Sequence, residues 1–203
     1  MSKDRYRTLA GPGEAAIREK ASRFLAYAFA IADEDAFRSE ADRLARIHHD
    51  ARHHCYAWVL GTDGERERAN DAGEPQGTAG RPILRRIHAA GLTFAAVVVV
   101  RYFGGTLLGK GGLVRAYGEA AQLALQAAPV IERVVRLPLT VRCDHALAGA
   151  LRAAVLQADG EIVLASYEER CRMDVLLPSS VIPVFRKNWS VRGVLFGDQP
   201  GGK

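Results

Sequence analysis

Hydrophobic residues fall into short apolar runs and helically spaced runs over the first two thirds of the chain. The run "TFAAVVVVRYF" is the most strongly β-forming, and "RFLAYAFAI" and "HHCYAWVLG" resemble it. Asp33 is a typical N-cap residue before a helical pattern. The polar residues 62–77 are expected to form a turn and a long loop, with or without a short hairpin arm. The pattern predicts strands over residues 23–31, 53–61 and 93–103, and helices over 34–47, 79–90 and 112–128.

The pattern changes from residue 137 onward, where short strands of alternating character predominate. Leu137, Leu139, Val141 and Cys143 are expected to point inward, as in a half-buried strand. The order of elements is βαββαβ, which predicts a ferredoxin-like four-stranded sheet with both helices on one face. We therefore expect an α+β protein of two domains, residues 1–132 and 133–203. The predicted strands of the second domain cover 137–143, 161–167, 170–177 and 191–196, with helices between 144 and 160 and over 179–188.

Composition narrows the function classes without naming one. The 203 residues are 48% hydrophobic and carry a formal net charge of +5, which permits contact with an acidic partner but does not demand it. Three cysteines without a C-x-x-C pair indicate buried, reduced thiols. No apolar stretch approaches the ~18 residues of a membrane span, and the N-terminus has no signal-peptide pattern. We expect a cytoplasmic protein with no membrane contact.

The segment "VVVVRYFGGTLLGKGG", residues 97–112, resembles a phosphate-binding P-loop. Gly111 stands where that motif has the Ser or Thr that binds Mg²⁺, and no other strand ends in a convincing metal-binding Asp. We therefore predict a close glycine turn and no nucleotide cofactor. The five glycines still leave backbone N–H groups free near a helix N-terminus, where an anion can be held.

Candidate catalytic groups lie in "NDAGEPQGTAGRPIL", residues 70–84. Asp71 and Glu74 could act as general bases or metal ligands, or they could cap backbone N–H groups while Thr78 caps the following helix. His54 could serve as a base for Cys55, although a small thiol within a strand is commonly part of a core. The histidines at 48, 49, 53 and 54 lack the spacing of a zinc site, so no metal is predicted.

Basic residues dominate the segment from Pro75 to Gly118, which contains no Asp or Glu. Such a distribution is typical of a phosphate-binding surface, and Tyr102 and Phe103 could stack on bases. The alternative is a solvated basic face with both aromatic residues in the core. The cations of the segment are Arg81, Arg85, Arg86, Arg101, Lys110 and Arg115.

These motifs, in this order, resemble the bacterial, YigZ-like branch of the IMPACT family over roughly residues 19–128. The resemblance implies an N-terminal domain folded like the second domain of ribosomal protein S5. It also implies a ferredoxin-like C-terminal domain similar to one in elongation factor G. Eukaryotic members regulate translation by interfering with an amino-acid-starvation kinase. One departure concerns Ala72, where the family usually has a second acid before Gly73.

Three functional hypotheses follow. The first is a non-enzymatic, translation-associated regulatory protein that binds RNA or the ribosome. Its anion-binding residues would be Arg81, Arg85, Arg101, Gly104, Gly105, Lys110 and Arg115. The second is a hydrolase that uses Asp71 or Glu74, with Thr78 and His54 as further candidates, in a pocket between the 70–78 loop and the 101–105 turn. The third is a protein-binding module that uses the C-terminal sheet, for which an exposed apolar patch on that sheet would be evidence.

Overall fold

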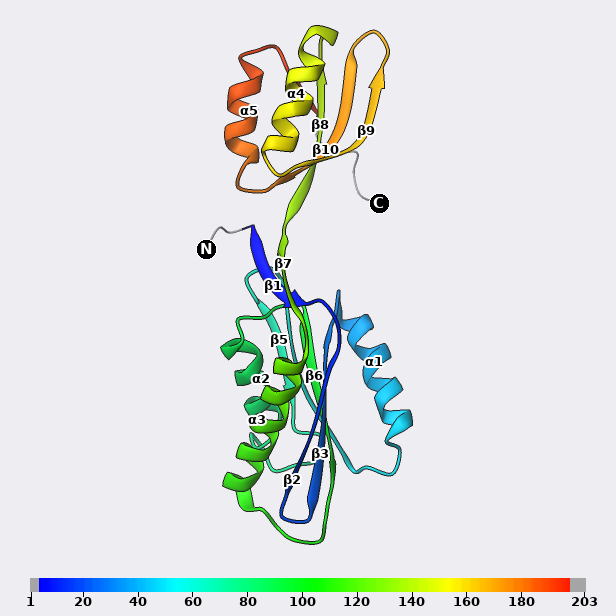
Figure 1. Cartoon of the computed structure of the whole chain (residues 1–203), viewed down its shortest axis with the longest axis vertical. Helices are drawn as coiled ribbons and strands as arrows, with labels where there is room; N and C mark the ends of the chain where they lie inside the picture. Colours follow the sequence, from blue (N-terminus) through cyan, green and yellow to red (C-terminus); the bar gives the residue numbers. More distant parts are fainter. Residues whose placement is uncertain (1–3, 198–203) are drawn as a thin grey trace. The chain divides into compact units, whose positions relative to one another are not determined.

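The computed structural model describes residues 4–197, which form two compact units (Figure 1). The larger unit is Tyr6–Arg133, and the smaller one contains the described residues from Val134 to Gly197 together with Asp4 and Arg5. The expected domains were residues 1–132 and 133–203, whereas this division groups Asp4 and Arg5 with the C-terminal residues. The cause of this grouping is the Asp4 carboxylate, which accepts hydrogen bonds from the backbone N–H of Ser180 at 3.0 Å and from the Ser179 hydroxyl.

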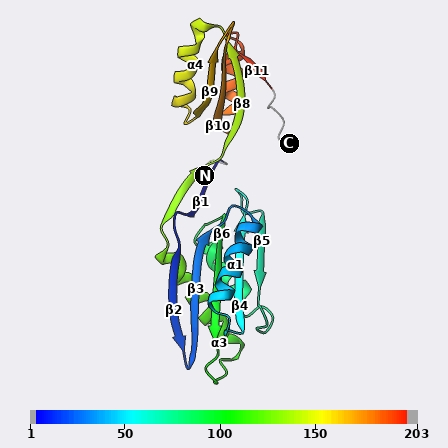
Figure 2. The same cartoon turned by 90° about the vertical axis from the view of Figure 1, so that its right-hand side faces the viewer.

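The N-terminal unit is a five-stranded antiparallel sheet covered by helices on both faces (Figures 1 and 2). Strand β6 is central, and all its residues except Tyr102 are buried, which explains its unbroken apolar run. Helix α1 packs on one face, while α2 and α3 pack against each other on the opposite face. The sheet order is β2 (Gly13–Glu19), β3 (Ser22–Ala30), β6 (Ala95–Tyr102), β4 (His53–Leu60) and β5 (Arg66–Asn70). The helices are α1 (Glu34–Ile47), α2 (Gly80–Ala89) and α3 (Gly109–Ala127).

Several elements of this unit differ from expectation. Strand β2 was not predicted, and neither were β1 (Arg5–Leu9) and β7 (Val130–Val134), which pair as a separate two-stranded sheet. Strand β5, in contrast, confirms the short hairpin arm allowed for residues 62–77, because it pairs with β4 in antiparallel fashion. Helix α3 begins at Gly109, three residues before the predicted start, so the Gly-Lys-Gly-Gly sequence is its first turn.

The C-terminal unit has the predicted ferredoxin-like fold. Its four strands are antiparallel in the order β11-β8-β10-β9, and both helices cover one face (Figure 1). Leu139, Val141 and Cys143 are buried as expected. Leu137 is 44% exposed instead, because the core on that strand begins at Leu139. The elements are β8 (Arg136–Cys143), α4 (His145–Gln157), β9 (Glu161–Tyr167), β10 (Cys171–Pro178), α5 (Ile182–Ser190) and β11 (Leu195–Gly197).

Two simpler expectations concern cysteines and membranes. Cys55, Cys143 and Cys171 are free and buried, which confirms the prediction of buried thiols. Among the described residues, none of the helices is both long enough and apolar enough to cross a membrane.

Candidate functional site

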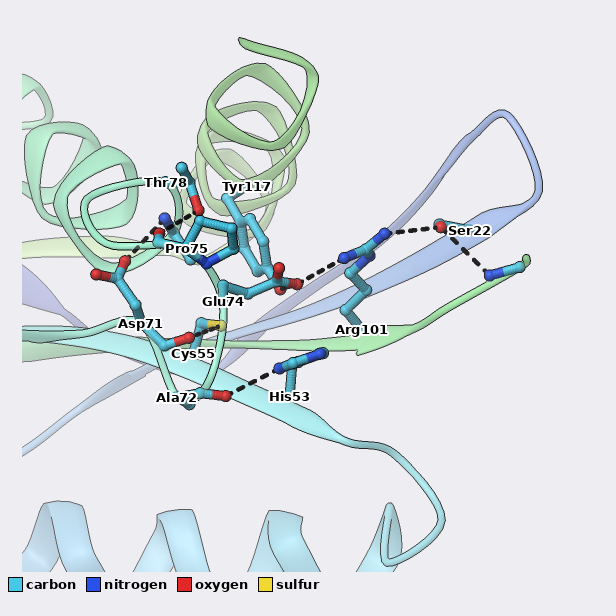
Figure 3. A network of polar contacts seen from close by, with 12 residues as sticks. Ser22, His53, Cys55, Asp71, Ala72, Glu74, Pro75, Thr78, Arg101 and Tyr117 are labelled. Carbon is cyan, nitrogen blue, oxygen red and sulfur yellow. Dashed lines mark hydrogen bonds and ion pairs between the residues drawn. The ribbon is translucent and has the colours of Figure 1, made fainter. Parts of the chain in front are cut away.

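Asp71 caps the N-terminus of helix α2 (Figure 3). Its Oδ2 accepts a hydrogen bond from the backbone N–H of Gly77 at 2.7 Å, and its Oδ1 accepts from Ala79 and Gly80 at 2.9 Å each. Burial alone would raise the pKa of Asp71, but the three N–H donors outweigh it and hold the pKa below its ordinary value. Asp71 is therefore an ionised structural cap whose two oxygens are both occupied.

Thr78 and Cys55 are also held by local contacts (Figure 3). The Thr78 hydroxyl donates to the backbone oxygen of Pro75 at 2.6 Å, so it does not cap α2 as expected. The Cys55 thiol donates to the backbone oxygen of Asp71 at 3.0 Å, and burial raises its pKa to about 12. The Thr78 hydroxyl is therefore engaged as a donor to the backbone. The Cys55 thiol is almost entirely protonated at neutral pH, so it is not prepared to act as a nucleophile.

Glu74 and Arg101 form a buried ion pair between the loop that leads into α2 and the end of β6 (Figure 3). Arg101 Nη1 donates to Glu74 Oε1 at 2.7 Å, and the Tyr117 hydroxyl donates to the same oxygen at 2.8 Å. The two charged side chains are only 6% and 3% exposed. Each charge is therefore balanced inside the protein, which is the condition under which such groups tolerate burial.

Arg101 has further contacts that fix its position. Its Nη2 donates to Ser22 Oγ at 3.3 Å, and its guanidinium lies over the rings of Phe24 and Phe103 at 5.5 and 5.3 Å. Its Nε is buried and has no hydrogen-bond partner among the described residues. One strong donor at this place is therefore left unpaired by the described part of the chain.

The turn after β6 brings the backbone close to the β2–β3 hairpin. A Cβ on Gly104 would lie 2.0 Å from the backbone oxygen of Ala21, so only glycine fits there. Gly109 has a φ of +69° and begins helix α3. The side chain of its N-cap residue, Leu108, does not cap this helix, and the first turn contains no acid. The first N–H groups of α3 are therefore without a capping carboxylate, in contrast to those of α2.

A cavity of about 400 Å³ lies at this place, where the loop containing Glu74 meets the turn after β6. The hydrolase hypothesis required a concave site here. Glu74 and Arg101 supply buried polar groups, and Arg52 and Lys110 supply exposed cations. Phe103, 49% exposed, and Leu107, 81% exposed, add apolar surface. Three cations against one carboxylate make the lining suited to an anion.

His53, and not the predicted His54, lines this cavity. His53 Nδ1 donates to the backbone oxygen of Ala72 at 2.9 Å, because a carbonyl can only accept. His54 is the next residue on β4 and therefore points to the opposite face of the sheet. Burial lowers the pKa of His54, and its Nε2 has no partner within residues 4–197. The alternation of β4, with Cys55 and Ala57 in the α2–α3 core, was the signal that could have identified His53.

The predicted phosphate-contacting cations divide into two groups. Arg101 is buried and paired, so its charge is not displayed on the surface. Four others, Arg81, Arg85, Lys110 and Arg115, are exposed and form no ion pair with any described residue. They come from α2 and the first two turns of α3, which pack side by side.

The predicted stacking residues also separate. The Tyr102 hydroxyl bonds His48 Nδ1 and donates to Asp50 Oδ1, both at 3.0 Å, so Tyr102 is tied to the end of α1. Phe103 is half-exposed at the cavity. Of these two residues, Phe103 is therefore the one that can offer a ring to a ligand in this cavity. Within the described residues, no group of three or more His, Cys, Asp or Glu side chains is arranged to hold a metal ion.

The open face of the C-terminal sheet is mixed in character. At its centre the Thr140 hydroxyl donates to Asp174 at 2.7 Å, and Arg172 pairs with Asp174 at 3.1 Å. Leu164 and Leu195 are exposed on the outer strands β9 and β11. Polar residues separate these two leucines, so the described face lacks the continuous apolar patch that would favour the protein-binding hypothesis.

The Impact N-terminal domain model matches residues 20–125, just over half of the chain. The chain is 35% identical over 168 residues to the IMPACT family member YigZ of Escherichia coli, and the match covers 82% of each protein. The chain belongs to the IMPACT family. IMPACT family member YvyE of Bacillus subtilis is 31% identical over 169 residues, covering 83% of this chain and 78% of that protein. A crystal structure described as that of a hypothetical protein has a TM-score of 0.70 at 30% identity, covering 98% of this chain and 99% of the other.

The cavity lies within the range matched by the IMPACT model, because Arg52, Glu74, Arg101 and Lys110 all fall between residues 20 and 125. The departure at Ala72 also has a structural meaning. Ala72 has a φ of +44°, a left-handed conformation that Asp and Asn adopt more readily than Ala. The acid that the family resemblance implies at this position would suit this backbone conformation, without the need for a catalytic carboxylate pair.

Proposed function

We propose that this protein is a cytoplasmic, translation-associated regulator whose N-terminal unit binds RNA, free or within the ribosome. The observation that carries the proposal is the set of exposed cations on α2 and the start of α3, which have no ion-pair partner among the described residues: Arg81, Arg85, Lys110 and Arg115. Unpaired cations on neighbouring helices neutralise phosphates and release the counterions of a nucleic acid.

Two further facts support RNA as the partner. No Asp or Glu interrupts the segment from Pro75 to Gly118, so no acid of that segment repels a phosphate backbone. The family resemblance also implies a role in translation, as in its eukaryotic members. Within this proposal, Arg101 positions Glu74 and the turn after β6, and the exposed cations make the contacts with phosphate.

The test is the salt dependence of RNA binding. Fluorescence anisotropy with a short single-stranded RNA, from about 50 to about 200 mM salt, is expected to show an affinity that falls linearly on log–log axes. The double variant Arg85→Ala/Arg115→Ala should bind more weakly and lower the slope by about 1.4, since each single-strand phosphate contact contributes roughly 0.7.

A matched control is available in the C-terminal unit. Arg152→Ala/Lys187→Ala also removes two exposed cations, but from helices α4 and α5. This control should retain the affinity and slope of the wild type. Binding that is insensitive to salt, or equal in the two double variants, would contradict the proposal.

The hydrolase is a second candidate, favoured by the cavity at the predicted place. Asp71, Thr78 and Cys55 are occupied or buried, so Glu74 is the remaining acid that could act as a base. Its Oε1 accepts from both Arg101 and Tyr117, and only Oε2 is left for a substrate or water. Hydrolysis of a p-nitrophenyl ester or phosphate that disappears in folded Glu74→Gln protein would support this candidate. No turnover above the uncatalysed rate would exclude it for these substrates.

A further inference from the structure

The cavity at the start of α3 has the features of a built anion site. It is lined by Arg52, Lys110 and the first residue of α3, Gly109. The N-cap residue of this helix, Leu108, provides no side-chain cap, and the first turn contains no acid. The N–H groups at this helix start, together with the positive end of the helix dipole, can therefore bind an external acceptor. A volume of about 400 Å³ is that of a small-molecule site and exceeds the space a single ion needs.

A second observation points to a ligand independently of the helix. Arg101 lines the same cavity and is only 5% exposed, and its Nε is buried without a partner among the described residues. Buried donors are nearly always hydrogen-bonded in native proteins, to protein, water or ligand. The Nε of Arg101, a residue of the cavity lining, therefore lacks an acceptor among the described residues.

The remaining lining restricts the shape of the ligand. Glu74 and Arg101 are buried and form the inner wall, so a terminal anionic group fits better than a phosphodiester that continues in both directions. Phe103 is half-exposed, with the Arg101 guanidinium over its ring at 5.3 Å, and it offers a surface for a planar group. The ligand thus combines a terminal anion with an aromatic body.

We propose that this cavity binds a phosphate monoester carried by a nucleoside, from either a free mononucleotide or the phosphorylated end of an RNA. The phosphate lies at the N-terminus of α3 against Lys110 and Arg52, and the base lies on Phe103. Gly111 has no hydroxyl to bind Mg²⁺, so the site holds the phosphate through N–H groups and cations. The RNA source rests on the proposed function, whereas the free mononucleotide does not.

Isothermal titration calorimetry with AMP and adenosine on the full chain tests the cavity. AMP should bind at least about tenfold more tightly than adenosine, because the charged hydrogen bonds to phosphate are lost in the nucleoside. Lys110→Ala should weaken AMP binding about tenfold, and Lys187→Ala, an exposed cation of α5, should leave it unchanged. Equal binding of AMP and adenosine, no binding of AMP, or an unchanged affinity in Lys110→Ala would overturn the inference.

Gly111→Asp separates binding from folding. A Cβ at Gly111 meets only Arg115 Nη1, at 3.7 Å, so the position accommodates a side chain. The new carboxylate would occupy the helix N-terminus and repel phosphate, while it favours the helix. We expect AMP binding to be abolished with the thermal midpoint retained or raised. Unchanged AMP affinity in this folded variant would also overturn the inference.

Two RNAs of one sequence, with a 5′-phosphate or a 5′-hydroxyl, identify the source. Tighter binding of the phosphorylated RNA, lost in Lys110→Ala, assigns the cavity to RNA ends. Equal binding of both RNAs, together with binding of AMP, assigns it to a free mononucleotide and removes the RNA source. Failure of both RNAs to bind contradicts the proposed function, while the AMP titration still decides the cavity.

Discussion

Helices α2 and α3 pack side by side in the N-terminal unit, but they differ in whether a carboxylate accepts hydrogen bonds from their first backbone N–H groups. Both follow loops rich in glycine, and neither has a capping side chain at its own N-cap residue. The start of α2 is closed by Asp71, which lies nine residues before the first helical residue, Gly80, and accepts three backbone hydrogen bonds (Figure 3). The start of α3 has no acid and faces a cavity lined by Lys110.

This difference suggests separate roles for the acid-containing loop of residues 70–84 and the glycine-rich turn within residues 97–112. A helix N-terminus needs an acceptor, and the chain supplies one to α2 from within. Because the described chain supplies none to α3, we place the proposed binding site at the glycine-rich turn, although the acid-containing loop has the residue types expected of catalysis. The buried Glu74–Arg101 pair lies between these two motifs and holds the acidic loop to the end of β6.

The largest expected effect comes from breaking that pair. Glu74→Ala leaves Arg101 buried without its counter-charge, and we expect a loss of about 3–5 kcal/mol in the free energy of unfolding. The control Glu40→Ala removes the acid of the exposed Glu40–Arg43 pair and should cost about 1 kcal/mol or less. Urea unfolding of both variants measures the difference. Similar losses in the two variants would show that the pair does not hold the motifs together.

Removal of the cap of α2 should have an intermediate effect. Asp71→Asn replaces one acceptor oxygen by a donor, and we expect a loss of about 1–2 kcal/mol at neutral pH. The folded-state pKa of Asp71 is below its ordinary value, so its stabilisation is present above that ordinary value and is lost as the pH falls through the folded pKa. The difference between wild type and variant should therefore shrink on acidification.

Asp33→Ala provides the reference for this cap. Asp33 caps α1 by accepting one hydrogen bond, from Ala36 N–H at 2.8 Å, so its removal should cost less than the change at Asp71. Urea unfolding at neutral and acidic pH measures both variants. A pH-independent difference for Asp71→Asn, or a larger loss for Asp33→Ala, would contradict the role assigned to Asp71.

The smallest expected effect comes from closing the start of α3. Gly111→Asp should raise the free energy of unfolding by about 0.5–1 kcal/mol, because it places a carboxylate at the positive end of the dipole and removes a helical glycine. Gly149→Asp is the matched change inside α4, where the added side chain meets no atom within 4 Å. Thermal unfolding should show a smaller gain for Gly149→Asp. An equal gain would mean that the start of α3 does not favour negative charge.

The sequence by itself determined the elements with strong local patterns. The apolar run of β6, the Asp33 cap of α1 and the βαββαβ order of the C-terminal unit were all predictable, because local spacing and capping express them. It did not reveal β2, an edge strand that is only partly buried and exposes Glu14, Ala16 and Arg18. Weakly apolar strands acquire their structure from pairing with neighbours, which a local pattern does not contain.

Only the tertiary structure decided how the candidate site residues are used. Glu74 and Arg101 are far apart in sequence but form an ion pair in the fold. The register between β4 and β6 pairs Arg101 with His53, so the two side chains share one face of the sheet and His54 points to the other. The charge of Arg101 was visible in the sequence, but its burial and its partner were not. Long-range packing sets burial, pairing and the direction of each side chain. For that reason the sequence located the junction between the acidic loop and the glycine turn. Only the fold showed that Asp71 caps the start of α2 and that the start of α3 has no such carboxylate among the described residues.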